Sequence, residues 1–243
     1  MSPYPRAILF DLDDTILSAY TRPDLAWQVI AEEYAAHIAP LAPGEVAGRI
    51  AAVARRVWAD EDRAREERKD LPGARRRIVA EALGDTLNAT LAGEIADRFT
   101  AYREEQMHVF PGAAETIDIL KAAGVKLALV TNGDAVTQRG KIDRFDLAHR
   151  FHHIQIEGEA GFGKPDLRAY EHALEALGVT AADAWIVGDN LEWEVAAPQR
   201  LGLFAIWHDH KGEGLPEGSP YRPDRIIRTL SDLIAPSDPK GLP

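Results

Sequence analysis

Short apolar runs bounded by polar residues or glycine recur along the chain and predict the strands of a buried sheet. Such runs, rich in Leu and β-branched residues, are typical of parallel strands covered on both faces, although a short run alone does not exclude a helix. The predicted strands lie at 7–13, 125–131, 184–188 and 203–207, with a weaker one at 153–156 and a last short strand and helix at about 225–234.

Stretches with the period of an α-helix separate these runs, at 113–123, 135–145, 167–177 and 191–201. Glycine follows three of these stretches, where a left-handed residue commonly ends a helix. Strand and helix in regular alternation are typical of a parallel sheet with right-handed crossovers. The pattern therefore predicts an α/β fold with a parallel-sheet core.

Residues 18–109 follow a different pattern. These 92 residues are rich in Ala, Glu and Arg, show helical periodicity and contain no convincing strand. The segment is too long for a loop within a compact domain. We therefore predict an α-helical domain inserted after the first strand, with residues 1–17 and 110–243 forming the α/β core.

Composition narrows the classes of protein that fit. The 243 residues are 46% hydrophobic and 28% charged, which is ordinary for a globular protein. A net charge of −11 argues against nucleic-acid binding, and the absence of cysteine excludes disulfides, thiolate metal sites and a cysteine nucleophile. The start resembles no signal peptide, and no apolar run is long enough to span a membrane. We expect a cytoplasmic protein without membrane partners.

Residues capable of chemistry cluster where the predicted strands end, which is where open α/β sheets bind ligands. We interpret the eight histidines as surface residues, with His210 able to border the entrance of such a site. Four groups of residues lie at or near the predicted strand ends: Asp11, Asp13 and Thr15; Thr131, Asn132 and Gly133; Lys164 before Pro165; and Gly188, Asp189 and Asn190.

These residue types suit the binding of a phosphoryl group. Neighbouring carboxylates together with Asp189 suit Mg²⁺, which prefers oxygen ligands. A hydroxyl and backbone amides at Thr131 and Asn132, before a predicted helix start, suit phosphate oxygens, and Lys164 adds a positive charge. The set predicts a phosphate-binding pocket next to a carboxylate nucleophile.

Four motifs in this order, Asp11-x-Asp13-x-Thr15, Thr131-Asn-Gly, Lys164-Pro and Gly188-Asp-Asn, carry a resemblance to the haloacid dehalogenase-like superfamily. The helical insert falls where that family has its helical cap of the first type. The resemblance covers nearly the whole chain and implies a Rossmann-like core. It also implies a Mg²⁺-dependent phosphatase that hydrolyses a small phosphorylated metabolite through an aspartyl phosphate.

The resemblance further implies roles for individual residues. Asp11 would be the nucleophile, and Asp13 would protonate the leaving oxygen and then activate water. Thr131, Asn132 and Lys164 would bind the phosphoryl group. Mg²⁺ would be held by the carboxylates of Asp11 and Asp189 and the backbone carbonyl of Asp13.

Supporting roles would fall to Thr15, Asn190 and Glu194. Glu194 stands where the family commonly has Asp, and Glu192 is a competing candidate for that position.

Three alternative functions use the same scaffold. A sugar phosphomutase shares every core residue named above. A 2-haloacid dehalogenase lacks the acid found here at Asp13, because a halide leaving group needs no proton. A binding module without catalytic activity would be expected to have lost Asp11 or Asp13. Phosphate monoester hydrolysis is the function that we favour.

Overall fold

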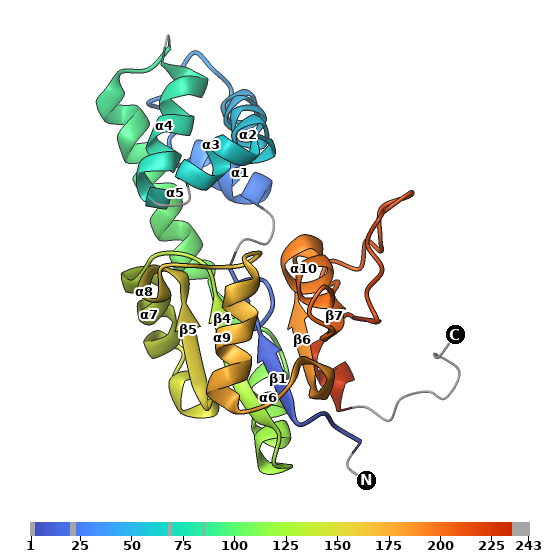
Figure 1. Ribbon diagram of the computed structural model, residues 1–243. Coiled ribbons are helices and arrows are strands. Elements are labelled where there is room, and N and C mark those ends of the chain that lie inside the picture. Colours follow the sequence, from blue (N-terminus) through green and yellow to red (C-terminus); the bar gives the residue numbers. More distant parts are fainter. Residues whose placement is uncertain (1–2, 20–22, 68–69, 85, 235–243) are drawn as a thin grey trace. The chain divides into compact units, whose positions relative to one another are not determined.

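The computed structural model describes residues 3–19, 23–67, 70–84 and 86–234. The chain divides into two compact units, one comprising Met1–Ser18 and His108–Pro243 and the other Ala19–Met107 (Figure 1). Among the described residues, no helix is both long enough and apolar enough to cross a lipid bilayer.

The first unit is built on a six-stranded sheet with the order β5-β4-β1-β6-β7-β8, in which every neighbouring pair is parallel. The predicted α/β fold is thereby confirmed. All six predicted strands are present, and their observed bounds are β1 (Ala7–Phe10), β4 (Lys126–Thr131), β5 (His153–Ile156), β6 (Ala184–Gly188), β7 (Phe204–His208) and β8 (Arg225–Ile227).

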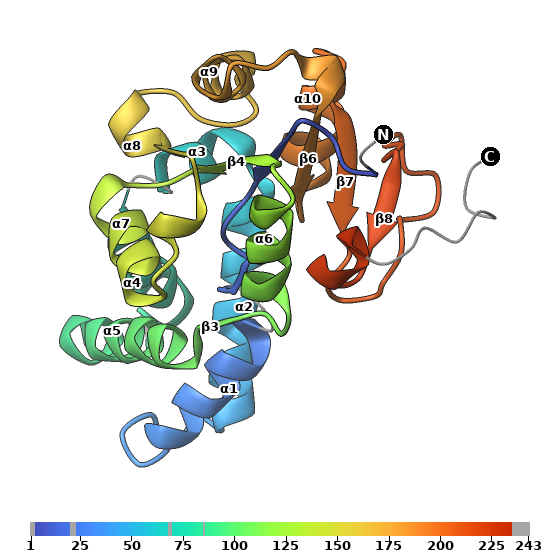
Figure 2. The ribbon, with the colours of Figure 1, turned by 90° about the horizontal axis from the view of Figure 1, so that it is seen from below.

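The central strand β1 is completely buried because helices cover both faces of the sheet. Figure 2 shows α9 (Leu167–Leu177) and α10 (Ala197–Gln199) on one side and α6 (Ala113–Ala122) on the other. Ala7 and Leu9 pack with α9 in one apolar cluster. Alternate side chains of a strand point to opposite faces of the sheet, so those of Ile8 and Phe10 pack on the other face.

Strand register sets the level at which the polar residues emerge. Phe10 pairs with Leu129 of β4 and Val187 of β6. The next residue of the chain, Asp11, donates its backbone N–H to the carbonyl of Val187 at 3.0 Å. Asp11 therefore leaves the sheet beside the ends of β4 and β6.

The second unit is helical, and its described residues form no strand. Its core includes Trp27, whose ring stacks on Phe99 with 3.5 Å between centroids. The helices are α1 (Pro23–Glu33), α2 (Pro43–Ala59), α3 (Glu61–Glu67), α4 (Leu71–Leu83) and α5 (Ala89–Gln106).

A short antiparallel ribbon joins the two segments of the first unit at the points where the chain leaves for the helical unit and returns. β2 (Leu17–Ser18) pairs with β3 (His108–Val109), and the sequence did not predict either strand. Two-residue strands carry too little periodicity to be recognised from a pattern.

The predicted helix at 191–201 is replaced by two shorter elements. A π-helical turn, η4 (Leu191–Ala196), is followed by the single turn α10. Pro198 has no backbone N–H, so it cannot continue the hydrogen-bond ladder of an α-helix. Single π-helical turns are often found at functional sites.

Candidate active site

The carboxylate of Asp11 is held from both sides. Lys164 Nζ donates to Asp11 Oδ1 at 2.6 Å, and Thr15 Oγ1 donates to Oδ2 at 3.0 Å. Asp11 is 8% exposed and Thr15 is fully buried. Burial raises the pKa of Asp11, although the Lys164 ammonium opposes that effect. The two hydrogen bonds fix the orientation of a partly desolvated carboxylate, which is a suitable state for a nucleophile.

Lys164 lies between two carboxylates. Its Nζ is 2.6 Å from Asp11 Oδ1 and 2.7 Å from Glu194 Oε1, and its side chain is almost completely buried. Burial alone would lower the pKa of Lys164, but the charges of Asp11 and Glu194 raise it above its ordinary value. The lysine is therefore a permanent positive charge beside the proposed nucleophile.

The side chain of Asn132 positions the loop that carries Lys164. Asn132 Nδ2 donates to the backbone carbonyl of Lys164 at 2.6 Å, and the backbone N–H of Lys164 donates to Asn132 Oδ1 at 2.8 Å. The sequence predicted Asn132 as a substrate-binding residue. In the structure its side chain is engaged by the lysine backbone.

Glu194, and not Glu192, enters the site from η4. Glu194 is 1% exposed, and its Oε2 accepts the backbone N–H of Asn190 at 2.9 Å. A Cβ at Gly188 would lie 2.0 Å from Glu194 Cγ, so the glycine makes room for this side chain. Glu192 pairs instead with Arg200 at 3.1 Å on an exposed surface. Burial raises the pKa of Glu194 to about 7, with Lys164 opposing it.

Asn190 stabilises the start of the same turn. Its Oδ1 accepts the backbone N–H groups of Glu192 and Trp193 at 3.0 and 3.1 Å. The supporting role predicted for Asn190 therefore corresponds to a helix cap.

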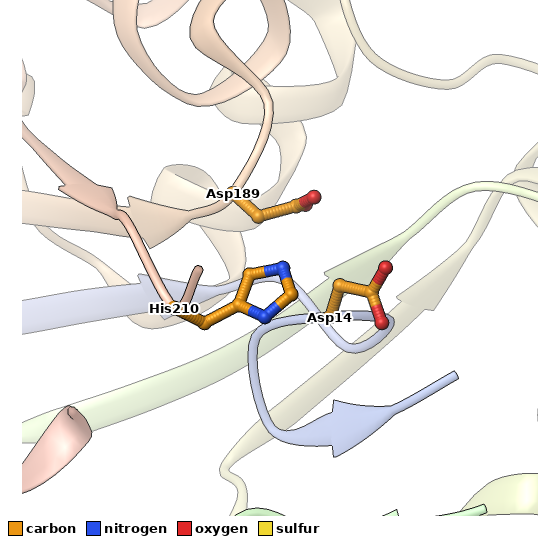
Figure 3. A group of neighbouring side chains, drawn as sticks. All are labelled: Asp14, Asp189 and His210. Atoms are coloured by element: carbon orange, nitrogen blue, oxygen red, sulfur yellow. The ribbon is translucent and has the colours of Figure 1, made fainter. Parts of the chain in front are cut away.

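Asp189 lies in a strongly negative environment. Burial raises the pKa of Asp189 well above its usual value, and the charges of Asp11, Glu194 and Asp14 add to the effect. Figure 3 shows Asp189 facing Asp14 and His210, and one potential ligand atom from each of the three lies within 4.8 Å of the others. Several carboxylates thus lie close to the buried Lys164.

These residues fit a divalent cation. Their oxygens are the donors that Mg²⁺ prefers, and a cation would offset the repulsion that raises the pKa of Asp189. Two ligand sets share Asp189: the predicted one with Asp11 and the backbone of Asp13, and a second one with Asp14 and His210. Burial lowers the pKa of His210 and so favours its neutral form, which is the form that binds metals.

Asp13 is held by two residues that the sequence analysis missed. Lys141 Nζ lies 2.8 Å from Asp13 Oδ1 and 2.7 Å from Oδ2, and Gln138 Nε2 donates to Oδ2 at 3.2 Å. Gln138 Nε2 also donates to Oγ1 of Thr131 at 2.5 Å. Both residues belong to α7 (Ala135–Arg144). Their three-residue spacing on a predicted helix, just after the Thr131 motif, was the available signal.

Two further residues near the loop after β1 were also missed or misplaced. Asp14 is buried and adopts a positive φ of 57°, which is uncommon for residues other than glycine. His208 is 2% exposed, and its Nδ1 lies 3.1 Å from the backbone oxygen of Asp14. The interpretation of all histidines as surface residues is therefore wrong for His208, because β7 carries it into the core.

Comparison with known proteins places this geometry in a family. Residues 5–202 match the model of the haloacid dehalogenase-like hydrolases. The phosphoserine phosphatase of Thermus thermophilus is 33% identical, over 94% of this chain and 98% of its own length.

Solved structures with the same architecture include two bacterial proteins. The HAD-hydrolase YfnB from Bacillus subtilis, in a form bound to magnesium, has a TM-score of 0.68 and 26% identity, covering 95% of this chain and 97% of its own. The 2-haloacid dehalogenase from Pseudomonas syringae has a TM-score of 0.61 and 26% identity, covering 95% and 96%.

Proposed function

The chain belongs to the haloacid dehalogenase-like hydrolases, as its four motifs led us to expect, and on this premise we propose that it is a Mg²⁺-dependent phosphatase acting on a small phosphate monoester. One observation carries the proposal. Lys164 and Thr15 orient the Asp11 carboxylate. A second carboxylate, Asp13, follows two residues later in the chain and is held by hydrogen bonds of its own.

In the first step an oxygen of the Asp11 carboxylate attacks phosphorus, and the bond to the leaving oxygen breaks. Asp13, in its protonated form, donates a proton to that oxygen, so the product leaves as an alcohol. The phosphoryl group is then esterified to Asp11. Lys164 and the hydroxyl of Thr131 would bind its oxygens, close to the places where negative charge develops.

In the second step water attacks the phosphorus of the aspartyl phosphate. Asp13, now a carboxylate, accepts a proton from that water, and the bond between phosphorus and the Asp11 oxygen breaks. Inorganic phosphate leaves and both carboxylates return to their starting states. A cation held by Asp11, Asp189 and the backbone of Asp13 would supply positive charge to the phosphoryl oxygens.

Asp13 favours this chemistry over dehalogenation. A halide leaves without a proton, so a dehalogenase has no use for an acid held in place by Lys141 and Gln138. The likeness to a 2-haloacid dehalogenase at 26% identity reflects a shared scaffold. A phosphomutase would use the same core residues, and it is distinguished by its product.

A screen of phosphorylated metabolites tests the proposal. Purified protein with Mg²⁺ should release inorganic phosphate from at least one small monoester, and the 33% identity to a phosphoserine phosphatase makes phosphoserine the first compound to try. A sugar phosphate isomerised without phosphate release would indicate the mutase. If no compound reacts while the protein binds phosphate, the binding module is the better description.

Removal of the metal should inactivate the enzyme. We expect EDTA to abolish hydrolysis and Mg²⁺ to restore it, because the uncompensated carboxylates around Asp189 repel a phosphate dianion. Asp189→Asn should raise the Mg²⁺ concentration for half-maximal activity by at least about tenfold. His210→Gln is the matched control: an unchanged requirement supports the set containing Asp11, and an equal rise supports the set containing Asp14. Full activity in EDTA would contradict the metal assignment.

The role of Asp13 predicts a dependence on the leaving group. Asp13→Asn should slow hydrolysis of an alkyl phosphate by about 10²-fold or more, because the alkoxide needs a proton. The loss should be clearly smaller with p-nitrophenyl phosphate, whose phenolate leaves unprotonated. Initial rates on the two esters give the comparison, and equal losses would remove the acid role.

A further inference from the structure

Helix α7 buries a polar face. Gln138 is 2% exposed and Lys141 is 8% exposed, whereas Val136 of the same helix is 84% exposed. Burial of an ammonium group is unfavourable unless the group is paired and hydrogen-bonded. A helix that buries Gln and Lys while it exposes Val is therefore not arranged for apolar packing alone.

Lys141 engages both oxygens of Asp13. The distances from Nζ are 2.8 and 2.7 Å, and Gln138 adds a third contact at 3.2 Å to Oδ2. Contacts to both oxygens restrain rotation of the carboxylate. A restrained side chain keeps one of its oxygens directed at the atom with which it exchanges a proton, which in the first step of the proposed reaction is the leaving oxygen.

Gln138 links Asp13 to the phosphate-binding hydroxyl. An amide nitrogen carries two protons, so Nε2 can donate both to Asp13 and to Thr131 Oγ1, the latter at 2.5 Å. The Thr131 oxygen then acts as an acceptor, and its own proton is directed elsewhere. In the structure that proton points to the carbonyl of Asn132 at 3.4 Å, a long contact that a phosphoryl oxygen could replace.

We propose that Lys141 and Gln138 are positioning residues that hold the Asp13 carboxylate for proton transfer and fix it relative to Thr131. The proposal rests on the phosphatase function proposed above. Neither residue exchanges a proton or forms a bond with the substrate in this role. Their effect passes through Asp13, so it should disappear when Asp13 no longer transfers protons.

A double-mutant cycle tests this dependence. Wild type, Asp13→Asn, Lys141→Met and the double variant are assayed on phosphoserine, or on the best alkyl phosphate from the screen, and on p-nitrophenyl phosphate. Lys141→Met should lower kcat for the alkyl ester about 10–100-fold, as expected when a catalytic group is misplaced, and should lower it less for the nitrophenyl ester. Added to Asp13→Asn, it should cause no more than about a twofold further loss.

Lys121→Met, on the preceding helix α6, is the matched control, and thermal melts establish that each variant is folded. If Lys141→Met does not fold, Lys141→Gln takes its place in the same cycle. Equal losses on both esters, or losses that add fully to those of Asp13→Asn, would overturn the positioning role. An inactive wild type, or an active Asp11→Asn variant, would instead refute the proposed function itself.

Discussion

Asp11→Asn should reduce phosphate release by about 10⁴-fold or more, because an amide oxygen is a far weaker nucleophile than a carboxylate. The fold should survive the change. Asn can still accept from Lys164 through its oxygen, and its NH₂ can donate to Thr15, whose hydroxyl also accepts. Since burial already raises the pKa of Asp11, a neutral side chain is tolerated at this position. Initial rates and thermal melts measure the two effects.

Asp146→Asn is the matched control for that variant. The Asp146 side chain is 89% exposed, and its positive φ of 49° is a conformation that Asn also adopts. This variant should keep the wild-type rate. Phosphatase activity retained in Asp11→Asn, with the protein shown by mass spectrometry not to have deamidated, would sink the nucleophile assignment.

The sheet was predictable because its strands are buried on both faces. β1 is apolar throughout, and β4, β6 and β7 are mostly apolar as well. Such runs carry their signal within a few neighbouring residues. The pairing of Leu17 with Val109 has no such local signal, because the two residues are separated by the whole helical unit.

The choice between Glu192 and Glu194 could not be made from periodicity. In a regular α-helix, side chains two positions apart point in very different directions, but the sequence pattern does not say which of the two faces inward. The π-helical turn shifts the phase of the chain, and the space left by Gly188 receives the side chain of Glu194. Both features depend on how the turn packs against β6.

Lys141 and Gln138 could not be predicted as site residues for a related reason. The inward face of a helix is normally identified by its apolar residues, and in α7 that rule selects both Ile142, which is buried, and Val136, which is exposed. The buried face also carries Gln138 and Lys141, because that part of the helix borders the site. Sequence-level rules are expected to fail at functional positions of this kind, where a local preference is overridden by chemistry.

Lys164→Met should cost both activity and stability. The carboxylates of Asp11 and Glu194 would then lack the Lys164 ammonium group, which lies within 2.7 Å of both. Breaking a buried ion pair by removing one partner typically destabilises a protein by about 3–5 kcal/mol, and we expect a loss of that size at pH 8. Denaturant unfolding measures it, with Lys121→Met as the lysine control.

The loss should depend on pH with a definite sign. Without the ammonium, the folded-state pKa values of Asp11 and Glu194 lie further above those of the unfolded chain. Glu194 already has a pKa of about 7 with Lys164 present. A raised folded-state pKa gives stability that is present at low pH and lost as the pH rises through it. The variant should therefore lose less at pH 5.5 than at pH 8.

A second substitution separates charge from packing. Adding Glu194→Gln to Lys164→Met removes one of the two facing charges, so it should recover at least about 1 kcal/mol at pH 8 while hydrolysis stays lost. Glu194→Gln alone should stay within about 1 kcal/mol of the wild type, because Lys164 still neutralises Asp11. A destabilisation that is the same at both pH values and unchanged by Glu194→Gln would mean that the Lys164 side chain stabilises the core through its packing. Its charge would then not be what holds the nucleophile.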